Sequence, residues 1–274
     1  MVIGIDIGAT HIRAVKYGNK TLTGDMTKTP RSLKSFKKNL ISLIKNLDSK
    51  NISGIGLGVA GKLSPKKIIY SGNIKFLNGF ALPGFIRENF KVKVLMDNDT
   101  RCFMRAELIL GQAKGHKSAI GITLGSGLGG SLVWNGQIIP GAHYTAGEIG
   151  STGFRDSELE DYASAKFLNK YGYDFKRLAE NLADGLTSAV HLFDPECIIL
   201  GGGIMQNPKG GPVIKKICAQ KLRQNLRGRP AANVKVKTSR LGDFAGSLGA
   251  ALLIDPKLGK AGPKQVRFPK LHLK

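Results

Sequence analysis

Cysteine, tryptophan and acidic residues are scarce in this sequence of 274 residues, which contains three, one and 19 of them. Cys102, Cys197 and Cys218 are odd in number and lie far apart, each within an apolar pattern. They predict reduced, buried thiols rather than a disulfide framework, and no two of them have the spacing of zinc ligands. The sequence also lacks any run of eighteen apolar residues, which excludes a helix that spans a membrane.

A signal peptide is not expected, because a pattern typical of a strand begins at Val2 and leaves no room for one. Together with the reduced cysteines, this predicts a cytoplasmic protein without a membrane partner. The length allows one or two domains with a substantial core, and 42% hydrophobic residues is typical of a globular chain.

The shortage of acids leaves a formal net charge of +23, and the excess is uneven. Sixteen lysines and arginines and two acids fall between Gly201 and Lys274, whereas Thr145–Leu200 holds five basic and ten acidic residues. Such a charge favours anionic partners, and nonspecific polyanion binding stays open beside a simple role in solubility. No pattern of a sequence-specific nucleic-acid reader accompanies it.

The first informative stretch is Val2–Lys16, an apolar run that leads into Asp6, Gly8 and Thr10 before alternation resumes. This pattern predicts strand, tight turn and strand. A carboxylate at a strand end, a glycine turn and a hydroxyl suit a complex of a triphosphate with a metal ion. An ordinary hairpin whose aspartate caps its own turn is the alternative.

Two further glycine clusters follow strands. Gly125-Ser126-Gly127 lies in Ala119–Ile139, where Asn135-Gly136 predicts a type I′ turn between strands. A dinucleotide fingerprint must open a helix, so this cluster is better explained as a second hairpin whose amides can hold phosphate. Gly201-Gly202-Gly203 comes directly after a predicted buried strand, Cys197–Leu200.

A second predicted strand, Val92–Met96, is followed directly by Asp97-Asn98-Asp99, and a helix is predicted from Thr100. Asp99 is therefore expected at or just before a helix N-terminus, where the dipole favours its negative charge. It would serve there as a helix cap or as a functional group at the ligand-binding edge of an open sheet. Asp97 would point the other way.

Helical periodicity marks several other segments. Thr29 and Pro30 are expected to cap and open a helix that carries Leu33, Phe36 and Leu40. Further helices are predicted at about Leu82–Asn89, Leu178–Phe193, Val213–Leu226 and Gly246–Ile254, and an edge strand at Val234–Lys237.

Five blocks of this chain, in order, resemble the ROK family of sugar kinases, within the hexokinase–actin–Hsp70 ATPase fold. The blocks are Asp6–Arg13, Gly56–Gly61, Asp97–Glu107, Leu124–Glu148 and Leu192–Ile204. The resemblance implies an α/β protein with the two-lobed actin-like ATPase (ribonuclease H-like) fold and an active site in the cleft between the lobes. We expect lobes at 1–111 and 112–274, with the last helix a candidate to return to the first lobe.

The resemblance also implies roles for individual residues. Asp99 would be the general base, and the sugar would be bound by Gly61, Asn73, Asn98, Glu148 and Glu160. Asp6 would hold Mg²⁺ through water. The nucleotide or its phosphates would be bound by Asp6, Gly8, Thr10, Arg13, Gly125, Ser126, Gly127, Gly201, Gly202 and Gly203.

The chain departs from the family pattern at one metal site. The family's histidine after Glu-Ile-Gly is Ser151 here, and its cysteine-rich zinc loop is shortened to Thr152–Glu158. With one imidazole and all the thiolates missing, no zinc site is expected.

The resemblance implies an ATP- and Mg²⁺-dependent kinase that phosphorylates a hydroxyl of a hexose or N-acylhexosamine. A homodimer is the expected assembly, with a small-molecule sugar as substrate. A polyphosphate-dependent sugar kinase and a non-catalytic sugar-binding regulator of the ROK type are the alternatives.

Overall fold

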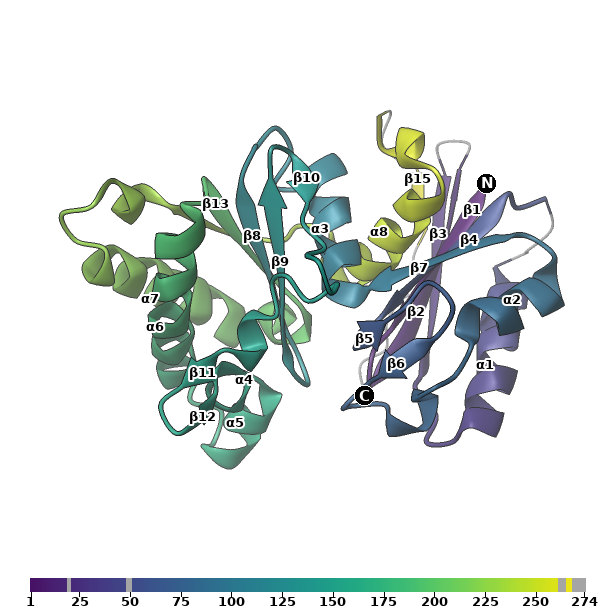
Figure 1. Cartoon of the computed structure of the whole chain (residues 1–274), viewed down its shortest axis with the longest axis horizontal. Helices are drawn as coiled ribbons and strands as arrows, with labels where there is room; N and C mark the ends of the chain where they lie inside the picture. Colours follow the sequence, from purple (N-terminus) through teal and green to yellow (C-terminus); the bar gives the residue numbers. More distant parts are fainter. Residues whose placement is uncertain (19–20, 48–50, 261–264, 268–274) are drawn as a thin grey trace. The chain divides into compact units, whose positions relative to one another are not determined.

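The computed structural model describes residues 1–18, 21–47, 51–260 and 265–267. The chain divides into two compact units, one formed by Met1–Leu110 together with the segment from Phe244 onward, the other by Gly111–Asp243. Helices and strands alternate in both, as expected of an α/β protein (Figure 1). The part of the chain that the structure describes contains no helix that is both long and apolar enough to cross a membrane.

The first unit is built on a mixed sheet with the strand order β15-β3-β2-β1-β4-β7. Strands β1, β2 and β3 form an antiparallel meander, while β4 and β7 run parallel to β1. Their bounds are β1 Val2–Ile7, β2 His11–Gly18, β3 Thr21–Lys28, β4 Gly54–Val59, β7 Lys93–Asn98 and β15 Gln265–Arg267, and a small ladder pairs β5 Lys62–Leu63 with β6 Ile68–Tyr70.

One face of this sheet carries large apolar side chains. Ile3, Ile5 and Ile7 of β1 are fully buried, and Ile55 and Leu57 of β4 join them in one cluster with residues of two helices. The helices are α1 (Leu33–Asn46) and α2 (Leu82–Phe90), preceded by a 3₁₀ turn at Lys75–Leu77. Alternation along each strand thus sends every second residue into this core.

The other face is lined with glycine and is covered by α8 (Ala245–Ile254), which also packs on α3 (Asp99–Ile109). A Cβ on Gly4 would lie 1.9 Å from the carbonyl oxygen of Ser247, and one on Gly56 would lie 1.8 Å from that of Ala250. The backbone of α8 therefore rests directly on β1 and β4, at a distance that excludes any side chain.

The start of α1 differs from the prediction. Ser32 caps the helix by accepting a hydrogen bond from the amide of Ser35, so Thr29 and Pro30 precede the helix. Thr29 is engaged elsewhere, since its hydroxyl donates to the carbonyl oxygen of Gly8 at 2.7 Å. A contact between distant parts of the chain has overridden a local capping signal.

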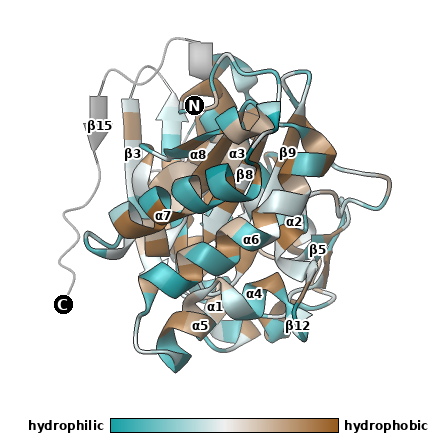
Figure 2. Ribbon diagram, turned by 90° about the vertical axis from the view of Figure 1, so that its left-hand side faces the viewer, coloured by the Kyte–Doolittle hydropathy of each residue, from teal (hydrophilic) through white to brown (hydrophobic). Residues whose placement is uncertain are grey.

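The second unit has a sheet with the order β10-β9-β8-β13-β14, in which β8, β13 and β14 are parallel. The strands are β8 Ala119–Leu124, β9 Leu128–Trp134, β10 Gln137–Ile138, β13 Cys197–Gly201 and β14 Lys235–Thr238. Two long helices, α6 (Phe175–Phe193) and α7 (Gly210–Asn225), pack together and bury apolar side chains with β8 and β13. In Figure 2, α7 shows both teal and brown turns, as expected of an amphipathic helix.

Shorter elements complete the second unit. They are α4 Leu159–Tyr162, α5 Ala165–Lys170, the hairpin strands β11 Gly153–Phe154 and β12 Ser157–Glu158, and 3₁₀ turns at Ile149–Ser151, Gly203–Gln206 and Pro230–Asn233. Another 3₁₀ turn, Gly242–Phe244, lies at the boundary of the units, and one at Pro256–Lys260 belongs to the first unit. Asn135 and Gly136 have φ values of 51° and 72°, which confirms the predicted type I′ turn. The three cysteines are buried, as predicted.

Candidate functional site

Asp6 lies at the end of β1 on the glycine-lined face of the first sheet, on the same side as Gly4. Its register partner on β4 is Gly58, and the partner of Gly58 on β7 is Asp97. A Cβ on Gly246 of α8 would lie 2.8 Å from the Asp6 carboxylate, so this glycine leaves room for it. The glycines that admit α8 also clear the space into which the carboxylate points.

The environment of Asp6 disfavours its charge. Burial, together with the nearby negative charge of Asp99, raises the pKa of Asp6 to about 7, although Arg13 acts in the opposite direction. Arg13 is the register partner of Asp6 on β2. A carboxylate kept close to a second carboxylate is stabilised by a cation placed between or beside them.

The Asp6 carboxylate is of the ligand type that Mg²⁺ takes in proteins. This ion takes oxygen ligands, usually one or two carboxylates, and completes its shell with water and substrate phosphates. Throughout the described ranges, no three His, Cys, Asp or Glu side chains are grouped to hold a metal ion. A Mg²⁺ ion at Asp6 would therefore have to keep water ligands.

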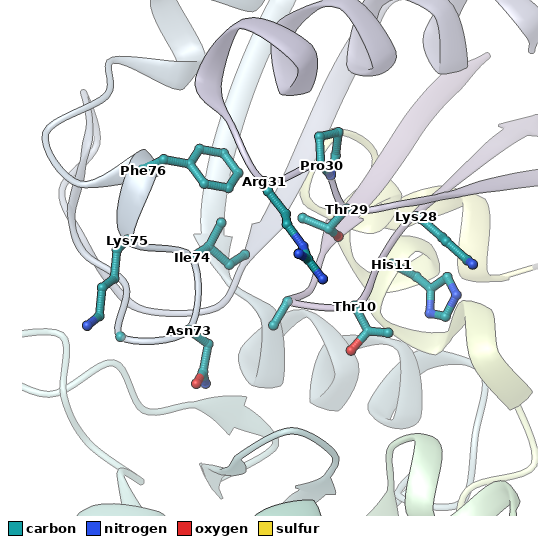
Figure 3. A pocket seen from close by; sticks show the side chains of 12 residues that line it. Thr10, His11, Lys28, Thr29, Pro30, Arg31, Asn73, Ile74, Lys75 and Phe76 are labelled. Atoms are coloured by element: carbon teal, nitrogen blue, oxygen red, sulfur yellow. The ribbon is translucent and has the colours of Figure 1, made fainter.

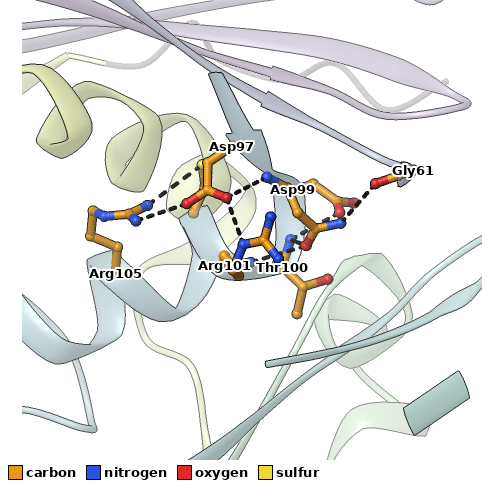
Figure 4. Close-up of polar contacts among 8 residues, drawn as sticks. Gly61, Asp97, Asp99, Thr100, Arg101 and Arg105 are labelled. Atoms are coloured by element: carbon orange, nitrogen blue, oxygen red, sulfur yellow. Dashed lines mark hydrogen bonds and ion pairs between the residues drawn. The ribbon is translucent and has the colours of Figure 1, made fainter. Parts of the chain in front are cut away.

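The junction of β7 and α3 orders the three polar residues Asp97, Asn98 and Asp99 (Figure 4). Asn98 is the N-cap: its Oδ1 accepts from the amides of Thr100 at 3.0 Å and Arg101 at 3.2 Å. Its Nδ2 donates to the carbonyl oxygen of Gly61 at 3.4 Å. Asp99 is the first residue of α3, where unsatisfied amides and the helix dipole favour a negative charge.

Asp97 has a different part in the same junction. Its carboxylate accepts from Arg101 Nε at 2.6 Å and from Arg105 at 2.8 Å, and its side chain is 16% exposed. Both arginines belong to α3, so Asp97 ties the strand to the helix that begins with Asp99. Asp97 therefore has a structural role at this junction.

The turn after β1 borders a pocket of about 760 Å³ that is lined by residues of the first unit (Figure 3). Thr10 and Asn73, expected at the phosphate and sugar sides, both line it. Two hydrogen bonds hold the turn: the Gly8 amide donates to the His11 carbonyl oxygen, and the Thr29 hydroxyl donates to the Gly8 carbonyl oxygen. These two expected ligand residues therefore share one cavity although 62 positions separate them.

Gly61 has a backbone reason to be glycine. Its φ is +136°, and a Cβ there would lie 2.3 Å from the carbonyl oxygen of Tyr70. The close approach of two backbone segments explains the residue without any ligand.

In the second unit the structure brings together two glycine clusters that are far apart in sequence. Gly125, Ser126 and Gly127 form the turn between β8 and β9, with the Gly125 amide donating to the Gly127 carbonyl at 3.0 Å. Gly201 pairs with Thr123 of β8. Gly202 has φ +88°, and a Cβ on it would lie 2.4 Å from the Leu124 carbonyl oxygen. Exposed amides of such turns can bind an anion.

The two glutamates expected to bind sugar lie in different local settings of the second unit. Glu148 precedes the 3₁₀ turn at Ile149–Ser151. Glu160, on α4, accepts from the Leu128 amide at 3.0 Å and from Lys166 Nζ at 2.7 Å. The Glu160 carboxylate is thus held beside the glycine turn by protein donors.

A small cluster at the β11–β12 hairpin was missed by sequence reasoning. The Arg155 guanidinium lies 5.2 Å from the ring centroids of both Phe154 and Tyr162 and donates to Asn181 at 3.0 Å. Asn181 is buried and donates in turn to the Tyr162 carbonyl oxygen at 3.1 Å. The hairpin that contains the shortened segment is therefore joined to α4 and α6 by cation–π contacts and hydrogen bonds.

Comparison with known proteins gives a consistent result. The model of the ROK family matches residues 2–161 and 173–257. An uncharacterized protein of Clostridium perfringens is 30% identical, over 90% of this chain and 95% of its own length. A glucokinase of Thermotoga maritima is 24% identical, over 94% of this chain and 98% of its own length.

Among solved structures, a ROK family glucokinase from Streptomyces griseus in complex with glucose and AMPPNP is 22% identical. It superposes with a TM-score of 0.83 over 92% of this chain and 98% of that chain. This likeness confirms the actin-like ATPase fold that the sequence predicted. With the family model matched over most of its length, the chain belongs to the ROK family.

Proposed function

We propose that this protein is an ATP-dependent sugar kinase that transfers the γ-phosphoryl group to a hydroxyl of a hexose or N-acylhexosamine. The observation that carries the proposal is the pair Asp6 and Asp99, two carboxylates from different elements of the first unit: Asp6 is buried on the glycine-lined face beside α8, and burial, together with the negative charge of Asp99, raises its pKa. One carboxylate can serve a metal ion and the other a proton, which are the two needs of phosphoryl transfer to an alcohol.

Asp99 is the general base in this proposal. A sugar hydroxyl at its ordinary pKa is a poor nucleophile, and a carboxylate within hydrogen-bond reach removes its proton as transfer proceeds. The N-terminus of α3 stabilises the negative charge of Asp99 before the proton arrives. The residues proposed to position the sugar are Gly61, Asn73, Asn98, Glu148 and Glu160.

Phosphates would be bound by backbone amides and small polar groups. The residues proposed for this role are Gly8, Thr10 and Arg13, the turn at Gly125–Gly127 and the cluster Gly201–Gly203. Asp6 would hold Mg²⁺ through water, and the bound ion would neutralise charge on the phosphates. Catalysis then rests on positioning and electrostatics, since little covalent chemistry is required of the protein.

Zinc has no part in this proposal. Ser151 and the segment Thr152–Glu158 offer no imidazole or thiolate, and the cluster around Arg155 supplies other contacts to the same hairpin. Elemental analysis should find no stoichiometric zinc, and a chelator should leave the melting temperature unchanged. One zinc per chain would contradict this and direct a search to His116, His143 and His191.

The test of the activity is a panel of neutral sugars, each incubated with ATP and Mg²⁺ while ADP and phosphorylated sugar are measured. In parallel, thermal shift with a nonhydrolysable nucleotide reports binding, because a ligand of the native state stabilises it. Sugar-dependent ADP release for at least one hexose or N-acylhexosamine is expected. Binding of sugar without turnover would favour a regulator, and turnover with polyphosphate but not ATP would change the donor.

A further inference from the structure

The pocket of the first unit is walled by three loops whose positions are fixed by internal contacts. The loop at Lys28–Arg31 is joined to the first turn, because the Thr29 amide donates to the Thr10 carbonyl at 3.0 Å and its hydroxyl donates to Gly8. The first turn, at Ala9–His11, is thus one loop of the pocket and Lys28–Arg31 is the second. The third loop, 72–76, is held in place by the buried side chain of Ile74 and by Phe76, whose ring lies 5.9 Å from that of Phe36. A volume of about 760 Å³ lies within the range of preformed small-molecule pockets, ~300–1,000 Å³.

The charge of this pocket is one-sided. Among the twelve residues that line it, His11, Lys28, Arg31 and Lys75 are basic and none is acidic. In Figure 3 the Arg31 side chain extends through the middle of the pocket, between Ile74 on one side and Thr10 and His11 on the other. A neutral polyhydroxyl ligand is better held by carboxylates and amides, as at Asn98, than by several cations.

The same pocket also has apolar walls, made by Ala9, Pro30, Ile74 and Phe76. A bare phosphate chain gains nothing from such surfaces, whereas the carbon skeleton of a sugar can pack on them. The combination of apolar walls, cations and two residues of the proposed site fits a carbohydrate that carries a negative group.

We propose that the pocket binds an anionic substituent, phosphate or carboxylate, of the acceptor sugar, and that Arg31 and Lys75 select for it. This inference rests on the proposed function, and it narrows the substrate from hexoses in general to charged sugars. Arginine is suited to the role because its planar guanidinium binds phosphate and carboxylate in a bidentate manner.

The test compares glucose with glucose 6-phosphate, glucose 1-phosphate and glucuronate, with each dissociation constant measured by calorimetry. The two phosphates and the carboxylate separate the two sources of charge. At least one charged sugar should bind tenfold or more tightly than glucose, as charge-assisted hydrogen bonds allow. The double variant R31M/K75M should abolish this preference and leave glucose affinity within twofold.

The matched control is R87M/K38M, which removes one arginine and one lysine that are exposed, lie in the same unit and do not line the pocket. It should leave every affinity unchanged. Equal binding of charged and neutral sugars, or a preference that survives R31M/K75M, would overturn the inference. So would a loss of polyphosphate binding in that variant without a loss for charged sugars, which would assign the pocket to the donor.

The two proposals can fail separately. Phosphorylation of a neutral sugar without any preference for charged ones would leave the kinase in place and refute the pocket. Tight, Arg31-dependent binding of a charged sugar, without phosphoryl transfer from any donor, would support the proposed selectivity of the pocket and refute the proposed kinase activity.

Discussion

The two faces of the first sheet differ in the size of the side chains that they carry, although these side chains belong to adjacent residues. On β1 and β4, Ile5 and Ile55 point into a core of large side chains, whereas Gly4 and Gly56 point at the backbone of α8. The apolar face gains stability from burial. On the glycine face the absence of side chains lets α8 pack close to the strands, and Gly246 of that helix leaves room for the Asp6 carboxylate. The carboxylate that we propose to hold the metal ion therefore lies on the face where the strands carry few side chains and the backbones approach most closely.

Substitution of Asp99 should give the largest effect and should separate activity from stability. Asp99→Asn is expected to lower kcat about 10²–10⁴-fold, the usual cost of losing a general base, with little change in sugar affinity. Rates from an ADP-release assay and affinities from calorimetry measure the two. Turnover like that of the wild type would remove Asp99 from the mechanism.

Adjacent residues on β4 test the two faces directly. Gly56→Ala should lower the free energy of unfolding by about 3 kcal/mol, because its Cβ would meet a helix carbonyl and the helix would have to move. Ile55→Val, on the apolar face, should cost about 1 kcal/mol. Urea denaturation of both variants gives the comparison, and equal costs would show that α8 can shift without penalty.

Substitution of Asp6 should show how much stability the protein loses by burying an ionised carboxylate on the glycine-lined face. Its folded pKa of about 7 lies above the ordinary value of 3.8, so the folded state binds the proton more tightly than the unfolded state. That contribution is full below pH 3.8 and is lost as pH rises through 7. Asp6→Asn should therefore be more stable than the wild type at pH 8, by about 2 kcal/mol after allowance for solvent.

The advantage of Asp6→Asn should shrink as the pH falls and disappear well below pH 3.8, where the wild-type carboxyl is protonated in both states. Thermal unfolding of both proteins in magnesium-free buffer across this pH range provides the measurement. Other titrating groups are common to both proteins and cancel in the difference. A variant that is less stable at every pH would mean that the ionised Asp6 is well compensated.

Asp97→Asn is the control for Asp99 and is expected to change turnover only a little. Loss of charge in the contacts with Arg101 and Arg105 should reduce the free energy of unfolding by about 1.5 kcal/mol, since these groups keep some contact with solvent. Turnover of the folded protein should stay within a few-fold of the wild type. A loss as large as that of Asp99→Asn would make the two carboxylates functionally equivalent.

Elements with a strong local pattern were predictable. Periodicity located β1, β7 and the helix that carries Leu182 and Leu186, and Asn135-Gly136 specified its turn. The start of α1 was not predictable, because the Thr29 hydroxyl donates to the Gly8 carbonyl oxygen instead of capping the helix. The short hairpin at 153–158 was missed for a similar reason, since Asn181 of a distant helix helps to hold it.

The candidate site shows the same limit. Strand ends indicated Asp6 and Asp99, but the cap made by Asn98 and the two arginines on Asp97 depend on side-chain directions that a sequence does not specify. The shared pocket of Thr10 and Asn73 depends on how three loops meet. Local patterns identify residue types, while tertiary contacts decide which of them share a surface.

The glycine face also has a consequence for biosynthesis. Strands β1 and β4 are synthesised long before the helix that covers them, which begins at Ala245. At ~5–20 residues per second, on the order of ten seconds pass between the completion of α3 and the arrival of α8. During that interval the nascent first unit exposes a bare strip of backbone, and the second unit, which is contiguous in the chain, can finish folding first.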